Sequence, residues 1–182
     1  MAALLPAGVK RVLEPSCGEG ALLRAVRKLH PEAFLVGYDI NPVALKKCGL
    51  GALGGGMGGP KPAYELEPGY CVLKDYTETV SSSAGSFDGV ILNPPYSKGQ
   101  DAQHVMHAMA LHVRVGGTLV ALMTPNALEK TTGPYKFLAE RLADLSVNGA
   151  AMWEITHQEI IPAKTFADTD IATLLIRIER RA

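Results

Sequence analysis

The sequence lacks several features that would place it in a specialised class of protein. Its three cysteines, Cys17, Cys48 and Cys71, are too few and too scattered for a disulfide framework or a zinc cluster. No apolar run approaches the roughly 18 residues of a membrane span. Residues 1–8 lack the basic and apolar parts of a signal peptide. A reducing cytoplasm is therefore the expected location, with no membrane partner.

An excess of charge of one sign is missing as well. The chain has 18 basic and 18 acidic residues, a balance that gives no general attraction to nucleic acid. Apolar residues make up 47% of the sequence, which is enough to bury a core and to exclude general disorder. The length of 182 residues fits one domain, and we expect residues 1–182 to form it.

Short apolar runs alternate with segments of helical spacing along the chain. The stretch 50–69 is rich in glycine and proline, has little periodicity, and is expected to be a flexible loop. Helices are expected at Ala21–Leu29, Pro42–Cys48, Ala102–Val113 and Tyr135–Leu145. Strands are expected at Val9–Leu13, Ala33–Tyr38, Tyr70–Leu73, Phe87–Leu92, Thr118–Met123, Ala150–Ile155 and Ile171–Ile178.

This alternation predicts an α/β fold with a doubly wound, mostly parallel seven-stranded sheet and helices on both faces. The last two predicted strands have a loop between them rather than a helix. We therefore expect an antiparallel edge at the C-terminal end of the sheet. Ligands of such sheets bind where the strands end, near the point where the strand order reverses.

Glycines and acids follow the first three predicted strands. Gly18 and Gly20, in the segment 14–20, would let a ligand approach the backbone closely. Asp39, at the end of the second strand, suits the hydroxyls of a ribose. Asp75-Tyr76, after the third strand, suits the amino group and ring of an adenine. Each feature has a plainer alternative, namely a glycine turn, a helix cap and a loop acid.

Asn93-Pro94-Pro95-Tyr96, after the fourth predicted strand, is the most specific signal. A residue before proline is held extended, and two prolines stiffen the segment. The side-chain oxygen of Asn93 and the carbonyl oxygen of Pro94 can then converge on one amino group. Tyr96 can stack on a planar substrate. The alternative is a proline-rich turn that closes a strand.

Together these segments resemble class I S-adenosylmethionine-dependent methyltransferases, and among them the adenine-N6 DNA methyltransferases with an Asn-Pro-Pro-Tyr motif. The resemblance implies a Rossmann-like fold, S-adenosyl-L-methionine as cofactor and no metal. It implies catalysis by Asn93, Pro94, Pro95 and Tyr96. It also places Tyr96 and Phe166 against the substrate base, with a core or hinge phenylalanine as the alternative for Phe166. The residues that it implies for the cofactor are Glu14, Pro15, Ser16, Cys17, Gly18, Gly20, Asp39, Ile40, Asp75, Tyr76 and Asn93.

The substrate stays open at this point. The resemblance favours DNA, but an RNA base or a protein glutamine amide needs the same two acceptors. A non-catalytic domain that binds cofactor or a partner is the third alternative. No segment is long enough for a separate target-recognition domain, so a partner subunit is a candidate for supplying one.

Two further groups of side chains have plain interpretations. His104, His107 and His112 lie on one predicted helix and are expected to face solvent or a partner. Cys17, without an adjacent histidine, is expected to be a small packing residue, and Trp153 is expected in the core.

Overall fold

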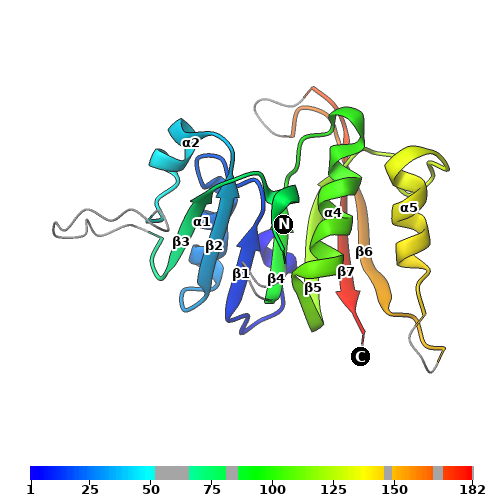
Figure 1. Ribbon diagram of the computed structural model, residues 1–182, viewed down its shortest axis with the longest axis horizontal. Coiled ribbons are helices and arrows are strands. Elements are labelled where there is room, and N and C mark those ends of the chain that lie inside the picture. The colour runs from blue at the N-terminus through cyan, green and yellow to red at the C-terminus, as the bar shows by residue number, and fades with distance from the viewer. Residues whose placement is uncertain (52–65, 81–85, 146–148, 166–169, 182) are drawn as a thin grey trace, which may run out of the picture.

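The structure, a computed structural model, describes residues 1–51, 66–80, 86–145, 149–165 and 170–181. At its centre lies a seven-stranded sheet with the order β3-β2-β1-β4-β5-β7-β6 (Figure 1). Its strands are β1 (Arg11–Glu14), β2 (Phe34–Asp39), β3 (Gly69–Leu73), β4 (Phe87–Leu92), β5 (Val113–Met123), β6 (Trp153–Ile161) and β7 (Thr173–Arg180).

Strands β1 to β5 pair in parallel, whereas β7 pairs antiparallel with both β5 and β6. The predicted doubly wound sheet with an antiparallel C-terminal edge is confirmed. The α-helices are α1 (Ala21–Leu29), α2 (Pro42–Lys47), α4 (Gln100–Leu111) and α5 (Gly133–Leu142). Among the described residues, 3-10 turns accompany them at η1 (Ala2–Leu4), η2 (Tyr76–Glu78) and η3 (Ser97–Gly99). Within the described ranges, no helix is both long enough and apolar enough to cross a bilayer.

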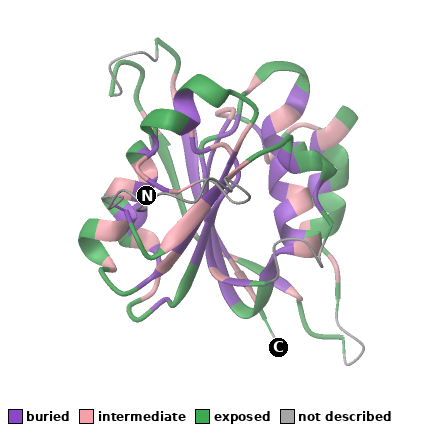
Figure 2. Cartoon of the chain, turned by 60° about the vertical axis from the view of Figure 1, so that its left-hand side comes forward, coloured by how far each residue is buried: buried purple, intermediate pink, exposed green. Residues whose placement is uncertain are grey.

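The core has two layers because alternate residues of a strand face opposite sides of the sheet. Figure 2 shows helices on both sides, with their buried residues turned toward the strands. Val12 and Leu35 pack with α1, whereas their neighbours Leu13 and Val36 pack with α4 and α5. Trp153 is 5% exposed, so its expected place in the core is confirmed.

The largest errors of prediction lie in the last three strands. β5 begins at Val113 rather than Thr118, because Gly116 and Gly117 continue the strand instead of turning the chain. Gly116 has φ 74°, which makes a local kink inside one strand. β6 continues to Ile161 because it pairs with β7 along its whole length. Most of the predicted loop 50–69 lies outside the described residues.

Candidate active site

The predicted motifs meet at one edge of the sheet. Parallel strands β1, β2, β3 and β4 all end there, and each is followed by one motif. The strand order places β1 beside β4, so the chain reverses its direction across the sheet between them. The segment after β1 and the tetrapeptide after β4 therefore flank the point where ligands of such sheets bind.

The loop after β1 needs its two glycines. Gly18 has φ 51°, and its N–H donates to Asp39 Oδ2 at 2.7 Å. Gly20 begins α1 with φ 86°, and a Cβ there would lie 2.3 Å from the carbonyl oxygen of Cys48. No side chain fits at this position without a shift of backbone, so the glycine holds the loop against the end of α2.

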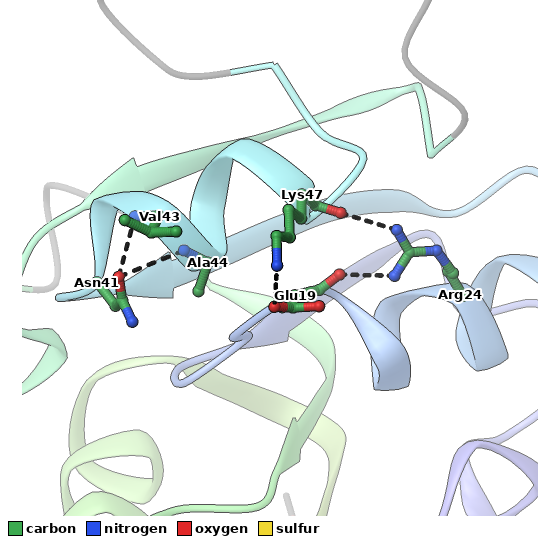
Figure 3. A network of polar contacts seen from close by, with 6 residues as sticks. All are labelled: Glu19, Arg24, Asn41, Val43, Ala44 and Lys47. Carbon is green, nitrogen blue, oxygen red and sulfur yellow. Dashed lines mark hydrogen bonds and ion pairs between the residues drawn. The ribbon is translucent and has the colours of Figure 1, made fainter.

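Polar contacts tie the same loop to its neighbours (Figure 3). Lys47 at the end of α2 pairs with the Glu19 carboxylate at 2.9 Å. The Arg24 guanidinium donates to the carbonyl oxygens of Glu19 and Lys47 at 2.6 and 2.9 Å. The Asn41 side chain accepts the N–H groups of Val43 and Ala44 and caps α2. The loop is thus held in place before any ligand binds.

Glu14 is an unusual residue for the end of a core strand. Its side chain is 3% exposed, and Oε2 has no hydrogen-bond partner among the described residues. Burial, with the nearby Cys48 and Asp39, raises the pKa of the Glu14 carboxyl well above its ordinary value. An orphaned acceptor beside a glycine loop fits a ligand that brings a cationic donor. The ammonium group of S-adenosylmethionine is such a donor.

Asp39 forms hydrogen bonds within the protein, in line with the plainer alternative of a helix-capping acid. Its Oδ1 accepts the N–H of Asn41 at 2.8 Å, while Oδ2 accepts the N–H of Gly18. Each carboxylate oxygen keeps a second lone pair, so these bonds leave room for a ribose hydroxyl. The position of Asp39 at the ligand edge is confirmed, and its contact with ribose stays a prediction.

A cavity of about 240 Å³, here called the cofactor-side cavity, opens beside these residues. Six of the expected cofactor residues line it, namely Pro15, Ser16, Asp39, Ile40, Asp75 and Tyr76, and so does Pro95 of the tetrapeptide. Glu14, Cys17, Gly18, Gly20 and Asn93 are not part of its lining. Sequence reasoning missed Lys74, Gln100 and His104. The spacing of four between the last two was the available signal, since such residues share a helix face.

Tyr76 is more enclosed than a stacking residue would be. Its side chain is 2% exposed, and burial raises the pKa of its hydroxyl. Its ring lies 5.9 Å from that of Tyr38, and between 4.9 and 5.7 Å from those of His104, His107 and His112. The Tyr76 hydroxyl has no hydrogen-bond partner among the described residues. An open ring face for an adenine is therefore not what the structure provides.

The same packing corrects the prediction for the histidines. His104 and His112 are buried and His107 is partly buried, because α4 and the residue that caps its C-terminus, His112, place these rings against Tyr76 instead of in solvent. Thr79 Oγ1 lies 2.9 Å from His107 Nε2 and 3.0 Å from His112 Nε2. Burial lowers the pKa of His104 and His107. A neutral His104 suits a cavity for a cationic cofactor.

Asp75 begins η2 as a cap. Its Oδ1 accepts the N–H and the hydroxyl of Thr77 at 2.8 and 2.7 Å. These two hydrogen bonds lower the pKa of the Asp75 carboxyl. The residue lines the cofactor-side cavity as expected, and its contact with adenine stays a prediction.

The tetrapeptide lies between two cavities. Pro95 lines the cofactor-side cavity, and Tyr96 lines a second cavity of about 310 Å³, here called the acceptor-side cavity. Pro94 is buried and Asn93 is exposed. The Tyr96 hydroxyl donates to Asn93 Oδ1 at 2.8 Å, so the oxygen expected to orient an amino group already carries a hydrogen bond.

Sequence reasoning missed most of the acceptor-side cavity. Segments after β4, after β5, at α5 and before β7 build it. Besides Tyr96, its lining consists of Lys98, Gly99, Thr124, Pro125, Lys130, Tyr135, Ile171, Ala172 and Thr173. The position of Thr124 directly after a parallel strand was the one available signal, since that strand ends at the ligand edge. Phe166, the expected base-contacting residue, lies outside the described residues.

The three cysteines gather in space although they are scattered in sequence. The sulfur atoms of Cys17 and Cys48 lie 3.9 Å apart, and Cys48 also contacts Cys71. All three are buried and free. In the part of the chain that the structure describes, no group of three or more histidine, cysteine or acidic side chains is placed to hold a metal. Cys17 packs at 4% exposure, as its plain interpretation predicted.

Comparison with known proteins connects this geometry to methyltransferases. "Ribosomal RNA small subunit methyltransferase C" of Shewanella sp. (strain MR-4) is 33% identical over 96 residues, which cover 52% of this chain and 24% of the relative. The protein of the same name from Shewanella loihica is 32% identical over 98 residues, covering 54% and 25%. The chain thus spans about a quarter of the length of the curated relatives it matches.

Solved structures show the same fold at low identity. TrmN from Thermus thermophilus superposes with a TM-score of 0.60 at 16% identity, over 94% of this chain and 44% of that one. An rRNA methylase from Streptococcus thermophilus superposes with a TM-score of 0.58 at 12% identity, over 100% and 92%. The family model of the methyltransferase small domain matches residues 1–141, and the chain belongs to that family.

Proposed function

We propose that this chain transfers a methyl group from S-adenosylmethionine to an exocyclic amino nitrogen of a nucleic-acid base, with RNA as the polymer. The observation that carries the proposal is the place of Asn93-Pro94-Pro95-Tyr96 between two cavities. Pro95 lines one cavity and Tyr96 lines the other. One rigid segment therefore contacts the space for a donor and the space for an acceptor.

Membership of the family implies S-adenosylmethionine as the methyl donor. When bound, this cofactor supplies an electrophilic methyl group on a cationic sulfonium. Glu14 would pair with its ammonium group, Asp39 would accept from its ribose, and Asp75 would accept from its adenine. The buried orphaned oxygen of Glu14 and the lining positions of the two aspartates fit these roles.

The acceptor nitrogen of a base is a poor nucleophile because its lone pair is delocalised into the ring. Asn93 Oδ1 and the Pro94 carbonyl oxygen would accept its two hydrogens and turn the lone pair toward the methyl group. They would also stabilise the positive charge that the nitrogen gains, which is a preorganised electrostatic effect. No strong base is needed, since the proton can leave after transfer.

The hydrogen bond from Tyr96 to Asn93 adds one step to this sequence. Asn93 Oδ1 keeps a second lone pair, and we propose that the amino group of the base nevertheless replaces the Tyr96 hydroxyl there. The released phenol ring then borders the acceptor-side cavity, where a base can stack on it. In the free protein, the hydroxyl keeps the asparagine side chain in one orientation.

RNA is preferred to DNA because the relatives at 32–33% identity are named as ribosomal RNA methyltransferases. None of the relatives and structures reported above supports the adenine-N6 DNA interpretation, which stays a prediction of the motif resemblance. A protein glutamine amide and a non-catalytic role are the alternatives that the experiment below separates.

The test is methyl transfer from S-adenosylmethionine labelled in its methyl group. Unmethylated ribosomal RNA, DNA and protein extract are offered in parallel, with an Asn93→Ala control. Label in RNA that is absent from the control supports the proposal, and digestion to nucleosides identifies the methylated nitrogen. Label in DNA or protein would contradict RNA as the substrate and keep the proposed chemistry. Cofactor binding without transfer to any of the three would contradict the catalytic role.

A further inference from the structure

The acceptor-side cavity carries two lysines that the proposed chemistry does not use. Lys98 and Lys130 both line it, together with the rings of Tyr96 and Tyr135. Neither lysine forms an ion pair with an acidic side chain among the described residues. Two cations without carboxylate partners beside an aromatic cavity predict an anionic ligand with a planar part.

Lys98 lies in a fixed piece of backbone. Its φ and ψ are 55° and 22°, a left-handed conformation that residues other than glycine adopt uncommonly. The next residue, Gly99, is wedged against α5, since a Cβ there would lie 3.0 Å from the Pro134 side chain. The hydroxyl of Ser97 donates to Gln100 at 2.7 Å across the same turn. The turn therefore constrains the backbone from which the Lys98 side chain reaches the cavity.

The Lys130 side chain packs on the ring of Tyr135. The Lys130 ammonium lies 4.2 Å from the centroid of that ring, within the range of a cation–π contact. The ring itself is fixed, because the Tyr135 hydroxyl donates to Asp101 Oδ1 at 2.8 Å. Asp101 is fully buried and also accepts the N–H and hydroxyl of Thr124 at 2.9 and 2.8 Å.

The buried Asp101 does not neutralise the two lysines by direct contact. Its carboxylate is occupied by hydroxyl and amide donors behind the cavity wall. The chain as a whole has no net charge, so any attraction for a polyanion must be local. A pair of lysines beside the tetrapeptide supplies such a local attraction.

We propose that Lys98 and Lys130 bind the phosphate backbone next to the target base, which makes the acceptor a polynucleotide rather than a protein. The assignment rests on the proposed function, since it concerns the acceptor of the same site. Lysine binds phosphate as a point charge, and the Tyr96 ring supplies stacking for a base. A neutral glutamine amide would gain nothing from two cations.

The test measures binding of a fluorescent single-stranded RNA oligonucleotide by anisotropy at several salt concentrations. Wild-type protein is compared with Lys98→Ala, Lys130→Ala and Lys98→Arg. Lys136→Ala is the matched control, because Lys136 is exposed on α5 and pairs with Glu140 instead of lining the cavity. Thermal melting of each variant checks that it folds. Because the readout is binding, it does not depend on methyl transfer.

Each alanine variant is expected to weaken binding several-fold and to reduce the slope of log K against log salt by about 0.7 to 1. Lys98→Arg and Lys136→Ala are expected to keep the wild-type slope. Equal slopes in all variants, or no measurable binding by wild-type protein, would overturn the assignment.

The two proposals can fail separately. Methyl transfer to RNA with unchanged slopes would remove the role of the lysines and keep the proposed function. Reduced slopes in a protein that transfers no methyl group would keep the phosphate contacts and remove the catalysis.

Discussion

The two cavities at the edge of the sheet differ in how the chain builds them. Loops that directly follow β1, β2 and β3 make most of the cofactor-side cavity, with Pro95, Gln100 and His104 from β4 onward. The acceptor-side cavity combines the segments after β4 and after β5 with α5 and the residues around the start of β7. The first contains short motifs at strand ends, and the second contains two lysines in front of a buried hydrogen-bond network. The donor side can thus be recognised from short motifs in the sequence, whereas the acceptor side depends on how several elements pack together.

The largest expected effect concerns the segment shared by the two cavities. Asn93→Ala removes one of the two acceptors for the amino group and leaves the cofactor-side lining intact. We expect kcat to fall about 100- to 1,000-fold, with little change in cofactor affinity. Steady-state kinetics with calorimetry of cofactor binding checks this, and an equal loss of affinity would contradict the role.

The next effect concerns the glycine loop. Gly20→Ala puts a Cβ 2.3 Å from the Cys48 carbonyl oxygen in a left-handed backbone, so both clash and strain oppose folding. We expect a loss of about 2–4 kcal/mol in the free energy of unfolding. Gly116→Ala is the matched control, because its φ is 74° and no atom lies within 4 Å of the added Cβ. That variant should lose only about 1–2 kcal/mol. Equal losses by urea denaturation would show that the contact with Cys48 has no special weight.

Glu14→Gln is expected to weaken function and to strengthen the free protein. The folded-state pKa of Glu14 is raised, so the folded protein holds more protons than the unfolded chain between the two pKa values. Stability of the wild-type protein therefore falls as the pH rises through that interval. A neutral glutamine removes this loss, so the variant should exceed wild type increasingly as the pH rises above the ordinary pKa of a glutamate, about 4.5.

The same substitution removes the partner of the cofactor ammonium. We expect cofactor affinity to drop about tenfold, the contribution of one charge-assisted hydrogen bond. Denaturation and calorimetry on the same samples measure both effects. A variant that loses stability at high pH, or that binds cofactor as wild type does, would contradict the account of Glu14.

The smallest expected effect is that of Tyr96→Phe. It removes the hydroxyl that occupies Asn93 Oδ1 but keeps the ring beside the acceptor-side cavity. We expect the acceptor KM to fall about twofold and kcat to change by less than about threefold. Tyr70→Phe, on β3 and outside both cavity linings, serves as control. A tenfold loss of kcat would mean that the hydroxyl itself contacts the reacting group.

The same contrast explains what the sequence could and could not predict. The alternation of apolar runs predicted the sheet, and the motif after each strand predicted six lining residues of the cofactor-side cavity. Periodicity could not show that His104 in α4 and His112 at its C-cap pack against Tyr76, because Tyr76 lies on another element. Nor could it show the bonds of Asp101 to Thr124 and Tyr135, which join residues 23 and 34 positions apart. Contacts of that range depend on the three-dimensional packing of elements.

The central claim is that one cavity holds the donor and the tetrapeptide acts on the acceptor. Single-turnover methyl transfer to RNA, measured over a range of cofactor concentrations up to saturation for Asp39→Ala and Asn93→Ala side by side, tests it most directly. Asp39→Ala should need more cofactor to saturate and then approach the wild-type rate, because removal of the Asp39 carboxylate weakens binding of the donor. Asn93→Ala should saturate at the wild-type cofactor concentration and stay about 100-fold slower. Recovery of Asn93→Ala by added cofactor, or a permanently slow Asp39→Ala, would contradict the division of the site.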